Sequence, residues 1–500
     1  MSDQTYQTIA VTLYFAAMLY IGWSAYRKTR DNLDDYMLAG RGLKPWVAAL
    51  SAGASDMSGW LLMGLPGAVY AKGLVESWIA IGLTIGAWLN WKFVAPRLRS
   101  YTEVAGNSIT IPSFLEHRLR DQSRSLRIVC GLIILVFFTF YVSSGMVAAG
   151  KFFDSTFGVE YIHGMLIVAV VTMVYTLFGG FLGATLTDVA QGLLMLAALV
   201  AVPIVALIEV GGPSVTVDTV NAVNPTFFSL FAGGTALGIV SAAAWGLGYF
   251  GQPHIIVRFM ALRSPQEATT ARRFGISWMV ATALGAISTA FIGIAYFALH
   301  PDKAPKDPET VFLVLAQILF HPFVAGLVLA AVLAAIMSTV SSQLVVCSSA
   351  LVEDLFKIFA EKSGRDAEIS DKTYVLLGRL GVLIVAVVAV LLAIDPSDSI
   401  LELVGFAWAG FGSSFGPVVL LALFWRRLTA PGALAGLIVG AVVAFVWGQW
   451  PPFELYEIVP GFLANLVVAI GVSLATYRPD GAVDAEFDEA ARLAEKQPAS

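Results

Sequence analysis

Asp56 is the residue in this sequence whose type and surroundings most strongly indicate chemistry. It is the one charged residue in the apolar stretch from Val47 to Tyr70. A carboxylate at the centre of a membrane costs roughly 2.5–3.5 kcal/mol unless the protein satisfies it. Glycine, alanine and serine around it favour a helix break that exposes carbonyls, and such oxygens suit a desolvated hard cation. The sequence predicts a cation-linked role; a buried salt bridge is the alternative, although few basic residues fall inside the other apolar runs.

A cluster of hydroxyl residues in a later apolar run is a second candidate for cation binding. Ser338 and Thr339 lie in the run Ala335-Ile-Met-Ser-Thr-Val-Ser-Ser342. Hydroxyls in membrane helices commonly bond back to their own helix, which is the alternative interpretation. Beside the carbonyls of a broken helix they form an oxygen-only site of low charge, which suits sodium better than a transition metal. Ser55 and Ser58, next to Asp56, either add hydroxyl ligands or cap the helix ends.

Aromatic residues interleaved with glycines indicate a pocket for an organic solute. Trp245, Tyr249 and Pro253 belong to the run Trp245-Gly-Leu-Gly-Tyr-Phe-Gly-Gln-Pro253. Membrane aromatics are often interfacial anchors, but glycines at a break fit a pocket wall better. Half-helix N-termini could hold a substrate carboxylate, and aromatic faces could cover an apolar ring or contact a cationic amine. Tyr141 is a further candidate, with lipid-facing packing as its alternative.

Two more charged residues lie beside apolar runs. Asp188 begins a run near the cytoplasmic side, where it is either a helix N-cap or a waypoint for cation exit. Arg41 lies in a loop just before the stretch that contains Asp56, and by itself it is a loop charge.

The composition predicts an all-α membrane protein. The chain has 500 residues, 58% of them hydrophobic and 13% charged, with a mean hydropathy of +0.78. A soluble interior of this size cannot hold so much apolar side chain, so the bilayer must act as solvent. The net charge of -5 argues against a nucleic-acid partner. Thirteen apolar runs can span a bilayer, at 8–26, 47–70, 74–95, 128–150, 164–180, 189–209, 233–251, 274–299, 311–350, 374–394, 400–424, 431–449 and 460–477. The ninth run should include a half-helix from Val311 to Leu319, before Pro322.

The distribution of basic residues predicts an N-terminus outside and a C-terminus inside. Of the 30 basic residues, all but four fall on one side of the thirteen runs, and the exceptions are Lys72, Lys151, Lys303 and Lys306. Positively charged loops stay in the cytoplasm. The acidic tail, 478–500, is then cytoplasmic, and we expect a solvated or fraying amphipathic segment, with a motif for a partner as the alternative.

The two glycine-rich runs suggest an internal repeat. They lie five runs apart, so 47–209 and 233–424 form two five-helix units of opposite orientation within one transmembrane domain, 1–477. Interrupted helices at corresponding places of inverted repeats indicate a binding site at the midplane. Gly432, Gly436 and Gly440 have small-xxx-small spacing, which is typical of close helix packing and could join two protomers of a homo-oligomer.

The runs that contain these residues resemble the sodium:solute symporter family, and within it the proline carriers. The resemblance rests on SAGASDMSGWLLMGLPGAVY (51–70), WGLGYFGQPHIIVRFMA (245–261), AAIMSTVSSQLVVCSSA (334–350) and VGFAWAGFGSSFGPVVL (404–420), and it covers nearly the whole chain. It implies thirteen helices around a ten-helix core with the inverted-repeat fold of the leucine-transporter type.

The resemblance also implies roles for individual residues. Sodium would be bound by the carbonyls of Ala54, Met57 and Ala335 and by the hydroxyls of Ser338 and Thr339. Asp56 and Ser58 match residues linked to sodium and proline binding. Tyr141, Trp245, Tyr249 and Pro253 would form the proline pocket, and Arg41 and Asp188 match positions linked to coupling and to cation release. Asp56 then either ligates sodium or acts through its field and the helix geometry.

The function implied is sodium-coupled import of L-proline by alternating access across a bacterial inner membrane. Sodium is the coupling ion, and no organic cofactor is expected. The alternative is a symporter of the same family for another small solute, such as pantothenate or a monocarboxylate. No phosphate-binding loop, nucleophile elbow or zinc signature occurs in the sequence, which disfavours an enzyme.

Overall fold

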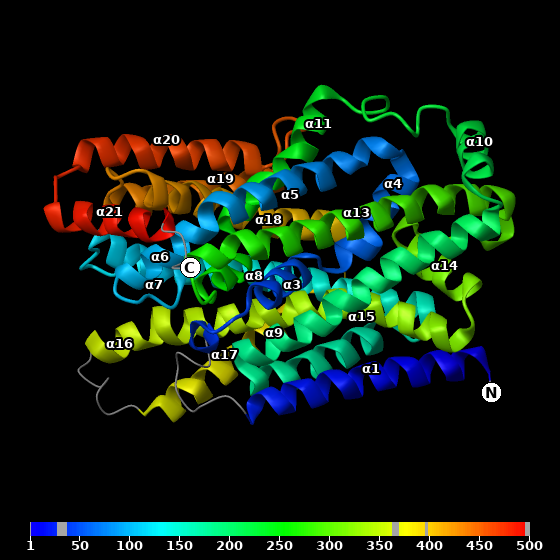
Figure 1. Ribbon diagram of the computed structural model, residues 1–500, viewed down its shortest axis with the longest axis horizontal. Helices are drawn as coiled ribbons and strands as arrows, with labels where there is room; N and C mark the ends of the chain where they lie inside the picture. Colours follow the sequence, from blue (N-terminus) through cyan, green and yellow to red (C-terminus); the bar gives the residue numbers. More distant parts are fainter. Residues whose placement is uncertain (1, 28–37, 363–369, 396–398, 496–500) are drawn as a thin grey trace.

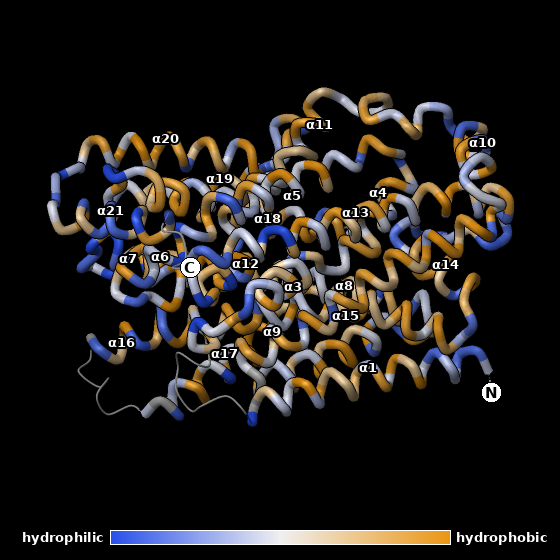
Figure 2. The backbone as a smooth tube through the Cα atoms, viewed as in Figure 1, coloured by the Kyte–Doolittle hydropathy of each residue, from blue (hydrophilic) through white to orange (hydrophobic). Residues whose placement is uncertain are grey.

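The computed structural model describes residues 2–27, 38–362, 370–395 and 399–495, which form a bundle of helices running mostly along the long axis (Figure 1). Ten helices in these ranges are long and apolar enough to cross a membrane. Figure 2 shows hydrophobic residues along most helices and hydrophilic ones gathered around α6, α7 and α21 at one end. The α-helices are α1 (Asp3–Tyr26), α3 (Pro45–Asp56), α4 (Leu65–Lys72), α5 (Trp78–Leu89), α6 (Ala95–Val104), α7 (Ile111–Leu119), α8 (Ser125–Phe157), α9 (Tyr161–Val210), α10 (Pro213–Val223), α11 (Ala236–Ala243), α12 (Pro253–Met260), α13 (Ala268–Leu299), α14 (Val311–Leu319), α15 (Pro322–Ser349), α16 (Lys357–Lys362), α17 (Asp371–Leu392), α18 (Ile400–Phe424), α19 (Ala430–Gln449), α20 (Ile458–Thr476) and α21 (Gly481–Glu495).

The first glycine-rich run is a broken helix, as the sequence predicts. Helix α3 ends at Asp56, and Met57 has the non-helical angles φ -80° and ψ 71°. A π-helical turn, η2 (Trp60–Gly64), leads from this break into α4. Carbonyls at such a break are released from the regular ladder, so they are available to a ligand.

The second glycine-rich run is broken as well. Helix α11 continues as a 3₁₀ segment, η5 (Ala244–Gly251), before Gln252 adopts an extended conformation and α12 begins at Pro253. The neighbouring α5 approaches η5 closely, because a Cβ atom on Gly86 would lie 2.2 Å from the carbonyl oxygen of Gly246. Glycine at this contact therefore lets the backbones meet.

Two other expectations about helix boundaries have different outcomes. The half-helix before Pro322 is confirmed as α14, which ends at Leu319. The runs expected at 164–180 and 189–209 are joined in α9, which bends at Gly180, where φ is 56° and ψ is -155°. Because glycine adopts this conformation without a steric penalty, the chain turns there without a loop.

The three glycines of α19 pack within the chain. A Cβ atom on Gly432 would lie 2.0 Å from the Ser473 hydroxyl, and one on Gly440 would lie 2.1 Å from the Ser413 carbonyl oxygen. Gly436 faces Asn465 in the same way. Helices α18 and α20 therefore occupy the face that the spacing suggested for a second protomer.

The acidic tail forms an amphipathic helix over 481–495, as expected, but this helix is docked on the bundle by one face rather than fraying; residues 496–500 lie outside the described part. Phe487 and Ala490 of α21 are buried. Phe487 lies 4.7 Å below the guanidinium of Arg97 and 5.4 Å from that of Arg118, on α6 and α7. Burial lowers the pKa of Arg118. Cation–π contacts and burial of Phe487 thus outweigh the solvation of the acidic side chains.

Candidate functional site

Asp56 is held by the other broken helix. Its side chain is 2% exposed, and its Oδ2 atom accepts a hydrogen bond from the Tyr249 hydroxyl of η5. Its Oδ1 atom is buried without a hydrogen-bond partner among the described residues. Within those residues no basic side chain lies within 4.0 Å of Asp56, so the salt-bridge alternative finds no partner there. A carboxylate with one free oxygen in a buried site is a binding group for a cation or a hydrogen-bond donor.

A small cavity lies against this carboxylate. It has a volume of about 20 Å³, and its walls include Asp56, Met57, Tyr249 and Met279. Such a volume holds about one water molecule or one small ion.

The oxygen atoms expected to bind sodium meet between α3 and α15. The Ser338 hydroxyl donates to the Ala54 carbonyl oxygen at 2.7 Å and lies 3.1 Å from that of Ala335. The Thr339 hydroxyl bonds to Ala335, 3.2 Å away, as the back-bonding alternative predicts. Met57 lies at the helix break. The structure therefore brings four of the five residues into direct contact, and the Ser338 hydroxyl contacts carbonyl oxygens of both helices.

Next to this cluster lie buried polar atoms without partners. In the described part of the chain, the Tyr141 hydroxyl and both ring nitrogens of His254 lack hydrogen bonds. The two rings meet edge to face, with centroids 5.8 Å apart. His254 follows Pro253, the first residue of α12. Ser58 is buried, and its hydroxyl accepts a long bond from the Trp60 backbone N–H at 3.5 Å. Unpaired buried donors and acceptors are costly, so they indicate a place for a polar ligand.

Trp245 belongs to a stack of aromatic rings and lines a large cavity. Its ring is stacked with Tyr456 at 5.3 Å and with Trp408 at 6.4 Å. A cavity of about 700 Å³ is lined by Trp245, Tyr456 and the carboxylates of Glu402 and Glu457, among others. Burial raises the pKa of Glu457. Sequence reasoning missed both Tyr456 and Trp408. Tyr456 lies in the loop before α20, whereas Trp408 lies in the run 404–420, whose glycines were a signal that could have found it.

Asp188 is part of a buried ion pair, so the N-cap interpretation is wrong. It lies well inside α9, because the helix continues through the bend at Gly180. Its Oδ2 atom is 2.9 Å from the guanidinium of Arg258, and both side chains are at most 1% exposed. The sequence interpretation counted Arg258 as a loop residue, whereas α12 carries it into the core. Pro253, which favours the start of a new helix, was the signal in the sequence that could have placed Arg258 on a helix rather than in a loop.

Serine hydroxyls form hydrogen bonds with both members of this ion pair. Ser51 donates to Asp188 at 2.7 Å, and Ser55 lies 3.2 Å away. Arg258 in turn donates to Ser342 at 2.6 Å. The pair therefore joins α3, α9, α12 and α15 directly beside the Ser338 cluster.

Arg41 binds oxygen atoms of two neighbouring segments. Its guanidinium donates to the Thr102 hydroxyl at 3.2 Å, to the Met260 carbonyl at 3.0 Å and to the Ser108 carbonyl at 2.7 Å. These contacts tie the start of α3 to the ends of α6 and α12.

Known proteins show the same sequence pattern and fold. The model of the sodium:solute symporter family matches residues 36–440. The high-affinity proline transporter PutP of Bacillus subtilis (strain 168) is 56% identical over 94% of this chain and 98% of its own length. The osmoregulated proline transporter OpuE of the same organism is 52% identical over 94% of this chain and 95% of its own length. A solved Na+-coupled sialic acid symporter shares the fold, with a TM-score of 0.80 at 20% identity, over 95% of this chain and 98% of the other. The chain therefore belongs to the sodium:solute symporter family.

Proposed function

We propose that this protein imports L-proline together with sodium across a bacterial inner membrane by alternating access. The observation that carries the proposal is the set of buried, unpaired polar atoms on Asp56, Tyr141 and His254 beside the Ser338 cluster. The named relatives are proline transporters at 52–56% identity over nearly their whole length, which supports proline as the solute.

Sodium is carried at the oxygen cluster between α3 and α15. The carbonyls of Ala54, Met57 and Ala335 and the hydroxyls of Ser338 and Thr339 supply neutral oxygen ligands, which suit a monovalent hard cation. The direct Ser338–Ala54 hydrogen bond gives way when the ion enters, because both oxygens then face it. Asp56, two residues from Ala54, adds negative potential without replacing these ligands.

Proline is bound between the two helix breaks. Its ammonium group is the donor that the free Oδ1 atom of Asp56 requires, with Ser58 beside it. Its carboxylate accepts from the Tyr141 hydroxyl and lies against the N-terminus of α12, which begins at Pro253 and carries the positive end of the helix dipole. Trp245 and Tyr249 cover the apolar ring.

Alternating access is supported by the contrast between the two sides of the site. The cavity of about 700 Å³ beside Trp245 gives a route from one side, which is the outside if the N-terminus is outside. On the other side, Asp188 and Arg258 close the route below Ser338 with a buried ion pair, and Arg41 holds the adjacent helix ends. Asp188 and Arg41 thereby act in coupling and in cytoplasmic release.

The membrane arrangement completes the proposal. The ten long apolar helices, together with the two broken helices and Tyr161–Leu177, make thirteen spans. Residues 47–209 and 233–424 form the two inverted repeats of one domain, 1–477. The basic loops hold the N-terminus outside and the C-terminus inside.

Uptake by purified protein tests the function. Proteoliposomes should accumulate labelled proline against its gradient when sodium is higher outside, and should lose this accumulation when the sodium gradient is collapsed by an ionophore. A panel of unlabelled solutes that includes pantothenate and a monocarboxylate should leave uptake unchanged, whereas unlabelled proline abolishes it. Sodium-driven accumulation of another member of the panel, with none of proline, would overturn the assignment.

A further inference from the structure

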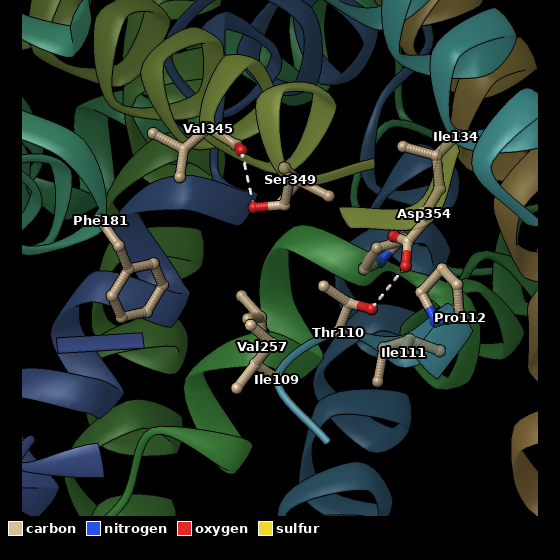
Figure 3. A pocket seen from close by; sticks show the side chains of 12 residues that line it. Ile109, Thr110, Ile111, Pro112, Ile134, Phe181, Val257, Val345, Ser349 and Asp354 are labelled. Carbon is tan, nitrogen blue, oxygen red and sulfur yellow. Dashed lines mark hydrogen bonds between the residues drawn. The ribbon is translucent and has the colours of Figure 1, made fainter. Parts of the chain in front are cut away.

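A second pocket lies near the end of α15, and Pro253 at the start of α12 separates it from the proposed proline site. It has a volume of about 20 Å³, enough for one water molecule or one small ion (Figure 3). Its lining combines α7, α12 and the end of α15 with Phe181 of α9 and Ile134 of α8. The polar side chains on it are those of Thr110, Ser349 and Asp354.

Asp354 presents a free oxygen to this pocket. It lies on the π-helical turn η9 (Ala350–Phe356), and its side chain is 1% exposed. One oxygen accepts from the Thr110 hydroxyl at 2.9 Å, the bond drawn in Figure 3, and from the Arg127 guanidinium at 3.0 Å. The other oxygen, Oδ2, is buried and has no partner in the described ranges. A carboxylate oxygen left this way loses its hydration without compensation, unless a cation reaches it.

The charges around Asp354 leave one negative charge unbalanced. Arg127 is shared by Asp354, Glu353 and Glu116, at 3.0, 3.1 and 3.0 Å. Arg124 pairs with Glu116 and Glu361, and Lys357 lies 3.4 Å from Glu353. Among the residues that the structure describes, this network thus sets four carboxylates against three basic groups. One monovalent cation in the pocket balances the network.

A row of residues on one face of α15 connects this pocket to the candidate sodium cluster. Ser338, Ser342, Val345 and Ser349 follow each other at spacings of four, three and four residues, which places them on the same face. Ser338 bonds to Ala54 in the cluster, and Ser349 lines the pocket. Eleven residues of helix span about 16 Å. The Asp188–Arg258 pair meets this row at Ser342, so it lies between the two places.

We propose that the pocket formed by Thr110, Ser349 and Asp354 is a second, transient binding site for sodium on its way to the cytoplasm. The proposal rests on the proposed function, because it needs sodium to leave along α15. Few oxygens line the pocket, and Arg127 lies against the far side of the carboxylate. Both features make the affinity low, which suits an ion that must be released rather than retained.

Comparison of net uptake with exchange tests the site in proteoliposomes. Net uptake driven by a sodium gradient requires sodium to leave, whereas exchange of labelled for unlabelled proline at saturating sodium on both sides requires no net exit. For Asp354→Asn we expect net uptake to fall about tenfold, the change that one lost charged contact produces in a rate. Exchange should stay within about twofold of the wild type. Asp354→Glu should restore most of the net uptake.

Glu353→Gln is the matched control. Glu353 is buried in the same network and pairs with Arg127 and Lys357, but it does not line the pocket. We expect both assays to change by less than about twofold for this variant. Equal losses of net uptake and exchange in Asp354→Asn would overturn the proposal, and so would unchanged net uptake or an equal effect of Glu353→Gln.

Thallium provides a readout that does not depend on transport. Crystals of the full chain soaked in Tl+ should show anomalous density in the pocket, and the density should be absent in Asp354→Asn. Density at Ser338 without density at Asp354 would refute the second site while leaving the proposed function intact. Absence of sodium-driven proline accumulation by the wild type would refute the proposed function instead.

Discussion

The buried pair of Asp188 and Arg258 should be strongly coupled in stability. Replacement of one partner leaves the other charge inside the protein without compensation, because both side chains are at most 1% exposed. Breaking such a pair typically costs about 3–5 kcal/mol. We therefore expect Arg258→Met and Asp188→Leu each to lower the free energy of unfolding by about this amount.

The double substitution should cost far less than the sum of the two. With both charges gone, the remaining cost is that of leaving the hydroxyls of Ser51 and Ser342 without their partners. The Ser51 hydroxyl lies 2.7 Å from Asp188 and 2.9 Å from Arg258, and the Ser342 hydroxyl lies 2.6 Å from Arg258. An unpaired hydroxyl costs about 1–3 kcal/mol. With about 4 kcal/mol for each single substitution and about 2 kcal/mol for each of the two hydroxyls, the coupling energy between the two positions should be about 4 kcal/mol in favour of the pair.

Unfolding in mixed micelles measures this coupling. Titration with SDS, followed by circular dichroism, gives the free energy of unfolding for the wild type, the two single variants and the double variant. The exposed pair Lys72–Glu76, with side chains 71% and 21% exposed, serves as the control, and its coupling should stay below about 1 kcal/mol. Single effects that add within about 0.5 kcal/mol in the Asp188–Arg258 double variant would refute the reasoning.

Three further predictions concern the ion site and the tail. Asp56→Asn should raise the half-saturating sodium concentration for proline uptake by more than about tenfold, because the field at the site loses its charge, and near-normal sodium activation would contradict this. Ser338→Ala should raise that concentration about tenfold while the maximal rate is kept, whereas Ser341→Ala, whose hydroxyl donates to the Ser338 carbonyl of its own helix at 3.1 Å, should not. Phe487→Ala should release α21 from the bundle and therefore speed tryptic cleavage after Arg492. Ala485→Ser, at an exposed position of the same helix, is the control, and equal cleavage rates for the two variants would count against the docking of the tail.

Both helix breaks could be predicted from the sequence, since their signals are local, whereas the full set of oxygen ligands was implied only by the family resemblance and stays a prediction. Glycines and small hydroxyl residues lower the cost of breaking a helix, and the breaks occur beside Asp56 and in the glycine-rich segment from Ala244 to Gln252. The end of the half-helix before Pro322 could also be predicted, because proline lacks the N–H that would continue α14.

Partners from distant segments could not be predicted in this way. The bond between Tyr249 and Asp56, the pair of Arg258 and Asp188, and the stacking of Tyr456 on Trp245 each join residues far apart in the chain. An arginine at the end of an apolar run is typical of a loop, and only the direction of α12 after Pro253 carries it into the core. Likewise, the acidic tail gave no sign of the arginines that surround Phe487.

The contacts of Asp56 give a physical route by which sodium and substrate can influence each other. Ala54 is bound to Ser338 of α15, and Asp56, two residues later, is bound to Tyr249 of the second broken helix. An ion that fixes the Ala54 carbonyl also fixes the end of α3, and therefore the direction of the free oxygen of Asp56. A ligand on that oxygen fixes the same helix end from the other side. Because both ligands favour one arrangement of a single short break, each must strengthen the binding of the other by the same factor. Direct ligation of sodium by Asp56 is then unnecessary for coupling, since the shared helix end transmits it.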